Sequence, residues 1–255
     1  MTMIRKYLPL AIILPIVFLS CTINVEGNRG LDGISNFSNV ITNESMTTEN
    51  RKTAAFDGVD ISSAFDVTIT DQAFNNEIQV SAPDFAMSNI VTKVEKGILK
   101  VYVDGSISLK NGEKLQISFP HRNLNNIKLS GASKLKADHQ LKVDKLNINL
   151  GGATKLDLNV ATNSLVLDHS GASKLDLKGN SQNFKANVSG ASKLDASDLK
   201  VKEGDFKVSG ASSVKIWVVN NLDIDASGAS KVSYKASSGV KLKINKSGAS
   251  KVTEF

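Results

Sequence analysis

A five-residue motif, Ser-Gly-Ala-Ser-Lys or a close variant, recurs seven times in the second half of this chain. Its glycines are 18 to 21 residues apart. A period near twenty is typical of solenoids built from stacked coils, and it is shorter than the repeats of helical arrays. The motif glycines, which we expect at a structural corner of each coil, are Gly131, Gly152, Gly171, Gly190, Gly210, Gly228 and Gly248.

The spacing of apolar residues within each repeat distinguishes strands from helices. The residues four before and four after every motif glycine are all apolar, and so are most of those six after it. These even offsets give a period of two, which belongs to β-strands. Each repeat is therefore predicted to form two short strands around Gly-Ala-Ser, and a polar loop such as residues 178–183 leads to the next repeat.

Two all-β architectures fit this pattern. In a parallel β-helix the glycine bends the chain at a corner, and the coils stack about 4.8 Å apart. In a long antiparallel meander, straight strands would have to run through seven glycines, which are unfavourable in mid-strand. We therefore predict an all-β parallel β-helix, a solenoid with coils of about 20 residues.

A column of small hydroxyl residues follows the glycines two positions later and shares the parity of the apolar residues. We expect these hydroxyls inside, where they could hydrogen-bond up the stack, unless a bulge at the glycine reverses their direction. The column consists of Ser133, Thr154, Ser173, Ser192, Ser212, Ser230 and Ser250.

The segment 54–128 shows the same alternation but lacks the Gly-Ala-Ser motif. Solenoids need atypical end units that cover the first coil. We therefore predict an atypical β cap or irregular coils over 54–128, continuous with the repeats of 129–255, in a single domain over 54–255.

The first 20 residues have the pattern of a secretory signal peptide, with Arg5 and Lys6 before an apolar run at 7–19. This run is shorter than the roughly 20 residues that span a bilayer. Phe18-Leu19-Ser20-Cys21 resembles the lipobox of bacterial lipoproteins, so the lone cysteine, Cys21, is predicted to carry a lipid. The alternative is a signal peptide with a free thiol beside its cleavage site.

Residues 21–53 are rich in Asn, Ser, Thr and Gly and show no sustained apolar period. This composition predicts a flexible tether. We therefore expect the protein to be exported and its folded domain to be held at a membrane by the Cys21 lipid. The expected membrane is the outer membrane. The sequence leaves open whether the domain faces the periplasm or the cell surface.

Several segments carry a resemblance to a known family: residues 56–61, 67–69 and 97–101, the Phe119-Pro120 step and the recurring Ser-Gly-Ala-Ser-Lys-Leu. In these segments the chain resembles the family described as putative auto-transporter adhesin, head GIN domain, which is widespread among lipoproteins of Bacteroidetes-type bacteria. The resemblance implies a right-handed β-helix on an exported lipoprotein. It implies no catalytic residue and no established activity.

A lysine follows the motif Ser or Thr in six repeats, at the parity opposite to the apolar residues and hence outside. In one interpretation this ladder attracts an anionic polymer such as lipopolysaccharide or an acidic glycan. In the other, lysine keeps a flat β surface soluble and prevents strand pairing. Asp157, Asp176 and Asp195, two positions beyond three of the lysines, favour the second. The ladder consists of Lys134, Lys155, Lys174, Lys193, Lys231 and Lys251.

Signals for catalysis, metals and cofactors are weak, and none of the three is predicted. His121, His139 and His169 have no metal-ligand spacing, and the repeated serines lack the Gly-x-Ser-x-Gly frame. Because β-helices can host polysaccharide lyases, a glycan-cleaving enzyme is the main rival. Trp217, the sole tryptophan, could stack on a sugar or pack under a loop. Nucleic acid is not expected, since neither the expected compartment nor the aromatic platforms for it are present.

Together these features predict a non-enzymatic exported lipoprotein that acts as an adhesive or structural module of the cell envelope. Glycan binding or cleavage is the alternative. The last coil would leave strand edges unpaired, and such edges readily pair with other strands. We therefore expect this coil to be covered by Glu254-Phe255 or buried in a homo-oligomer.

Overall fold

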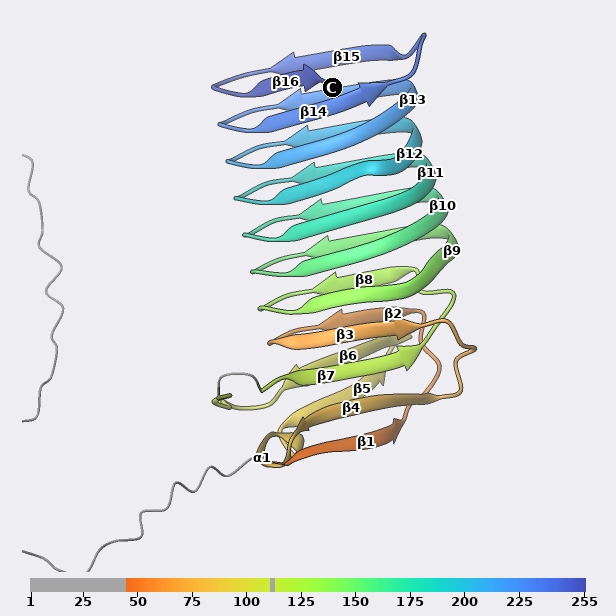
Figure 1. Cartoon of the computed structure of the whole chain (residues 1–255), viewed down its shortest axis with the longest axis vertical. Helices are drawn as coiled ribbons and strands as arrows, with labels where there is room; N and C mark the ends of the chain where they lie inside the picture. The colour runs from red at the N-terminus through yellow and green to blue at the C-terminus, as the bar shows by residue number, and fades with distance from the viewer. Residues whose placement is uncertain (1–44, 111–112) are drawn as a thin grey trace, which may run out of the picture. The chain divides into compact units, whose positions relative to one another are not determined.

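In the computed structural model, which describes residues 45–110 and 113–255, the repeats form a stack of parallel coils (Figure 1). Equivalent residues lie side by side, as Leu156 pairs with Leu175 and Leu175 with Leu194. An all-β solenoid of about six turns with coils of about 20 residues is thus confirmed. Its strands are β9 (Lys134–Leu150), β10 (Lys155–His169), β11 (Lys174–Val188), β12 (Lys193–Val208), β13 (Ser213–Ala226), β14 (Lys231–Ala236), β15 (Lys241–Lys246) and β16 (Lys251–Glu254).

The core is a set of apolar columns that run along the stack. Leu156, Leu158 and Val160 of β10 are fully buried, and the residues between them, Asp157 and Asn159, are exposed. Full burial of one such side chain contributes about 1.5–3 kcal/mol. Phe184 and Phe206 of neighbouring coils add an edge-to-face ring contact with 5.0 Å between centroids.

The Gly-Ala-Ser corner requires glycine for two reasons. All seven motif glycines have positive φ, between +66° and +79°. At Gly171 an added Cβ would also lie 2.4 Å from the Gly152 carbonyl oxygen, to which the Ala172 N–H donates a hydrogen bond of 2.8 Å. The corners therefore stack backbone on backbone.

The column of motif hydroxyls points inward, as predicted. Ser133, Thr154, Ser173, Ser192, Ser212 and Ser230 are at most 2% exposed. The Ser173 hydroxyl donates to the Ser170 carbonyl of its own coil at 2.9 Å and lies 3.3 Å from the Gly152 carbonyl of the coil before. Ser133, Ser192 and Ser212 likewise donate to a carbonyl of the preceding coil, whereas the buried hydroxyls of Thr154 and Ser230 have no hydrogen-bond partner in the described part of the chain.

The predicted loop at 178–183 is wrong, because β11 runs through it and pairs with both neighbouring strands. The strand bends instead of ending. At the bend Ser181 is buried, and its hydroxyl donates to the Asn183 carbonyl at 2.8 Å. Backbone pairing along the stack keeps these polar residues extended, so the coils of β9–β13 each have one tight glycine corner and one bent strand, whereas a turn separates β14 from β15.

The two corners divide the solenoid into two sheet faces. Face A contains β1, β4, β7, β3, the first halves of β9–β13, then β14 and β16. Face B contains β5, β6, β2, β8, the second halves of β9–β13, then β15. Outward side chains on each face form columns parallel to the stack.

The cap is the atypical β unit that the sequence predicts, and it mixes strand directions. Antiparallel pairs join β1 to β4, β4 to β7 and β5 to β6, whereas β2 pairs in parallel with β6 and β8, and β3 with β7 and the coil strand β9. Its elements are β1 (Met46–Lys52), β2 (Gly58–Ile61), β3 (Phe65–Thr70), β4 (Glu77–Pro83), α1 (Asp84–Met87), β5 (Ile90–Glu95), β6 (Ile98–Val103), β7 (Leu115–Pro120) and β8 (Asn126–Leu129).

Strands β2 and β3 form a further coil whose corner the motif search misses. Ser63 takes the place of the glycine, with φ of 78°, and the Ala132 N–H donates to its carbonyl at 2.7 Å. The Ser63 hydroxyl accepts a hydrogen bond of 3.3 Å from the Val103 N–H. A side chain is therefore tolerated at this first position of the column.

The predicted tether boundary at residue 53 is too late. Strand β1 (Met46–Lys52) belongs to the cap and pairs with β4 over its whole length. Its sequence carries no apolar period because it is an edge strand with exposed and half-exposed residues only. The predicted signal peptide, the predicted lipid site at Cys21 and residues 22–44 of the predicted tether lie outside the described residues. Within the described ranges no helix is long and apolar enough to cross a membrane.

Candidate functional site

The lysine ladder lies on face A, in one straight column of exposed or half-exposed side chains. Strand pairing places Lys134 beside Lys155, Lys155 beside Lys174 and Lys174 beside Lys193. Ser213 then interrupts the column before Lys231 and Lys251. At the other end the column continues into the cap at Asp66.

A second outward column, two residues further along each strand, carries the aspartates. The Lys174 ammonium lies 2.8 Å from the Asp176 carboxylate, and this hydrogen bond together with the negative charge raises the pKa of Lys174. Asp157 and Asp195 flank Asp176 in the neighbouring strands. Over β10–β12 the aspartates therefore offset much of the positive charge of the ladder.

A groove of about 450 Å³ opens on face A where the cap meets the first coils. Outward residues of five adjacent strands line it in two rows. One row runs through Ser81, Gln116, Asp66, Lys134 and Lys155, and the other through Gln79, Ser118, Thr68, Lys136 and Asp157. Lys114, directly before β7, completes the rim.

Charges in this groove are only partly compensated. Asp66 lies 3.6 Å from the Lys114 ammonium and 3.8 Å from that of Lys134, beyond hydrogen-bond length. Lys136 and Lys155 have no ion pair within the described part of the chain. In the aspartate column, Lys136 replaces an acid with a base, so the groove is more positive than the coils beyond it.

Sequence reasoning finds Lys134 and Lys155 but misses most of this groove. Gln79, Gln116, Thr68 and Lys136 come together only through the pairing of β4, β7, β3 and β9, which no periodicity reveals. The available signal is that all four sit between apolar neighbours, an alternation that predicts outward side chains.

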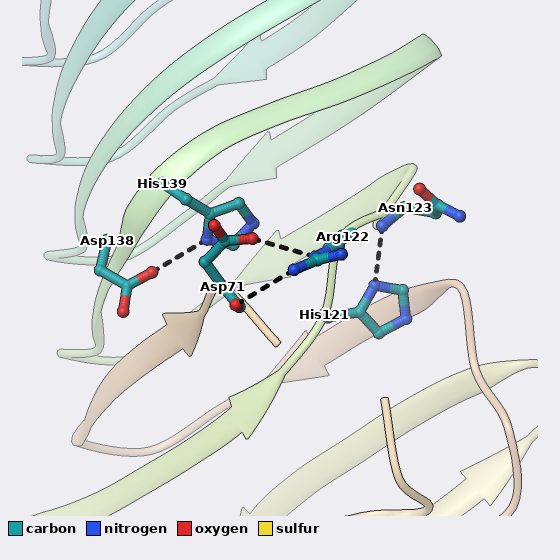
Figure 2. A network of polar contacts seen from close by, with 6 residues as sticks. All are labelled: Asp71, His121, Arg122, Asn123, Asp138 and His139. Atoms are coloured by element: carbon teal, nitrogen blue, oxygen red, sulfur yellow. Dashed lines mark hydrogen bonds and ion pairs between the residues drawn. The ribbon is translucent and has the colours of Figure 1, made fainter. Parts of the chain in front are cut away.

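A network of polar contacts near the bent corner contains two of the three histidines (Figure 2). The His121 ring lies 2.7 Å from the Phe56 carbonyl through Nε2, and the Asn123 N–H donates to Nδ1 at 3.2 Å. These contacts fit a neutral ring, and burial lowers the pKa of His121. Both ring nitrogens are thus engaged by backbone.

The other members of this network form separate pairs. Arg122 donates to the Asp71 carboxylate at 3.0 Å, and His139 Nδ1 lies 2.9 Å from Asp138 Oδ1 (Figure 2). No hydroxyl or thiol belongs to the network drawn. We therefore regard these contacts as structural: those of His121 and Arg122 lie within the cap, and that of His139 lies within β9. Nor does any group of three or more His, Cys, Asp or Glu side chains in the described ranges have an arrangement suited to a metal ion.

His169 and Trp217 occupy structural positions. His169 is 1% exposed between Leu150 and Val188, and burial lowers its pKa to about 4. The Trp217 ring lies between two ammonium groups, with Lys235 Nζ at 4.8 Å and Lys200 Nζ at 5.7 Å from its centroid. The ring that the sequence suggested for sugar stacking thus makes cation–π contacts with two lysines.

The last coil has open edges. Within the described chain, β15 pairs only with β13 and β16 only with β14. The Phe255 N–H donates to the Tyr234 carbonyl at 3.0 Å, yet its side chain is 58% exposed and Leu242 is 44% exposed. The tail therefore does not cover this end.

Comparison with known proteins places this geometry among related folds. A family model described as "Putative auto-transporter adhesin, head GIN domain" matches residues 55–238. The chain is also similar to a solved putative adhesin from Bacteroides fragilis, with 20% identity and a TM-score of 0.78 over 83% of this chain and 98% of that chain. No curated protein is significantly similar.

Two further solved structures have the same fold. A putative adhesin from Parabacteroides distasonis has 17% identity and a TM-score of 0.66 over 84% of this chain and 98% of that chain. A putative adhesin from Parabacteroides merdae has 18% identity and a TM-score of 0.61 over 84% and 97%. None of these three structures bears the name of an enzyme.

Proposed function

Because this chain belongs to the family described as putative auto-transporter adhesin, head GIN domain, we propose that it is a non-enzymatic adhesive module of an exported lipoprotein. The observation that carries the proposal is the repetition of outward columns in register on face A, from Lys134 to Lys251. A repeated surface offers the same contact at steps of about 4.8 Å, which suits a polymeric partner. An enzyme, by contrast, needs a single active site whose residues differ from those of the other coils.

Glycan arrays combined with a reducing-end release assay test this function. Adhesion predicts binding of one or more envelope or extracellular glycans without release of new reducing ends. Release that a single Asp or Lys substitution abolishes would establish the rival, a polysaccharide-cleaving enzyme. Absence of binding to any glycan or protein surface would leave a structural envelope role and contradict adhesion.

The proposal includes a lipid anchor at Cys21, with the outer membrane as the proposed location. It is supported by the signal pattern of residues 1–20, the lipobox-like Phe18-Leu19-Ser20-Cys21 and the polar composition of residues 22–44. A lipid at Cys21 would let this polar segment set the distance between the membrane and the cap.

We predict that Cys21→Ala moves the protein from the membrane fraction to the soluble fraction and abolishes labelling by a clickable palmitate analogue. Ser20→Ala, which keeps a small residue beside the cysteine, is the matched control and should leave both unchanged. Retention of the Cys21→Ala protein in membranes would contradict lipid anchoring. Protease accessibility of the anchored protein in intact cells would then show which face of the membrane it occupies.

A further inference from the structure

The groove at the junction of cap and coils is shaped by short side chains beside long ones. Thr68, Ser81 and Ser118 are short, while Lys114 and Lys155 stand at the rim. Its volume of about 450 Å³ falls in the range of small-ligand sites. Because it crosses five strands, it extends about 19 Å along the stack. This shape suits an elongated ligand that lies parallel to the solenoid axis.

The charge of the groove selects an anion. Lys114, Lys134, Lys136 and Lys155 face two carboxylates, Asp66 and Asp157. Neither contact of Asp66 is as short as a hydrogen bond, so the ammonium groups of Lys114 and Lys134 keep donors for a ligand. Further along the ladder, by contrast, Lys174 is closely paired with Asp176.

The neutral residues of the groove match a polyhydroxylated ligand. Hydroxyls of Thr68 and Ser118 and the amide of Gln116 have no side-chain hydrogen-bond partner in the described ranges, and each can both donate and accept. Ser81 already bonds to Thr48, and Gln79 makes a long contact to Asn50. Neither an aromatic ring nor an arginine lines the groove, which disfavours nucleobases and bidentate phosphate recognition.

We propose that this groove binds an acidic saccharide, with the lysines holding its carboxylate or sulfate groups and the hydroxyls and amides holding its ring hydroxyls. The proposal rests on the adhesive function above and assigns its ligand class and its place on face A. It also gives a role to Lys136, which lies where β10, β11 and β12 carry aspartate.

The test measures binding of an oligogalacturonate to the purified chain by calorimetry, with a neutral cello-oligosaccharide of the same length as comparison. Lys136→Glu should weaken binding about ten-fold, since an exposed ion pair is lost and a repulsive one replaces it. Lys215→Glu is the matched control, because Lys215 lies exposed in the same outward column on β13, away from the groove. It should change binding less than about two-fold.

A second variant, Ser118→Ala, leaves the charge unchanged and should weaken binding without altering its dependence on salt. Circular dichroism melts verify that each variant is folded. Equal weakening by Lys136→Glu and Lys215→Glu would overturn the groove in favour of a general field effect. Binding of neutral glycans on the array but of no carboxylated or sulfated one would overturn the acidic-saccharide assignment and leave adhesion standing, whereas binding of none would overturn both.

Discussion

Single residues at the glycine corner determine how closely coils can stack. Glycine there satisfies a left-handed backbone conformation and a backbone approach that leaves no room for Cβ. Ser63 shows that these two requirements are separable. It adopts the left-handed backbone conformation, with φ of 78°, although it carries a side chain. The conformation alone is therefore tolerable, and the close approach is what demands glycine.

We predict that Gly171→Ala lowers the free energy of unfolding by about 3 kcal/mol, since it adds a backbone clash to an unfavourable φ. Gly248→Ala should lower it by only about 1 kcal/mol, because its added Cβ would lie 3.0 Å from the nearest backbone oxygen, in the last corner. Urea unfolding followed by circular dichroism measures both. Equal losses would contradict the stacking argument.

His169 makes stability depend on pH. Burial lowers its pKa to about 4 in the folded chain, whereas an unfolded histidine titrates near 6.5. Between these values the unfolded chain binds more protons, so stability is complete above about pH 6.5 and falls as the pH drops toward 4. The loss is at most about 1.4 kcal/mol per pH unit, because one proton is involved.

We therefore predict that His169→Leu, which copies Leu150 of the coil before it, gives a flatter pH dependence of unfolding between pH 4 and 6.5. The difference in slope between the two proteins isolates His169 from His121, whose pKa burial also lowers. Urea midpoints at several pH values provide the comparison. Parallel curves would show that His169 does not titrate as described.

At the level of strands, the repeat was enough to predict a parallel stack but not where each strand ends. Apolar alternation and the Gly-Ala-Ser period predict the coils and the inward hydroxyls correctly. Residues 178–183 look like a loop because their side chains are polar, yet their backbone is paired on both sides in β11. Local composition reports side-chain exposure, whereas a solenoid imposes extended backbone through its neighbours.

The cap contains both a feature that local sequence patterns reveal and one that they do not. Its corner coil has apolar Val59, Val67 and Ile69 at the offsets used by the repeats, so a search by offsets instead of by motif would have found it. The groove residues differ, because β4 and β7 meet β3 through non-sequential pairing. Such pairing depends on the tertiary arrangement of the cap, and no local pattern in the sequence encodes it.

Considered as a whole molecule, the solenoid has two different ends. At the cap, β1 pairs antiparallel with β4 and carries polar residues along its length, which discourages further strand pairing (Figure 1). At the other end β15 and β16 each have one edge that no strand of the described ranges pairs with, beside exposed Leu242 and Phe255. Lys241 and Lys243 on β15 are exposed there too, so charge opposes contact while apolar surface favours it.

This balance leads us to predict that the chain forms a weak dimer through its last coil, with a second copy of the same end as the partner. Salt should strengthen the dimer, because it screens repulsion between the β15 lysines of the two copies. Sedimentation equilibrium at low and high salt measures this. Leu242→Lys should weaken association, whereas Phe85→Lys, an exposed apolar residue of the cap at 42% against 44% for Leu242, should not. A chain that stays monomeric at high concentration and high salt would show that lysine protection prevails over the open strand edges.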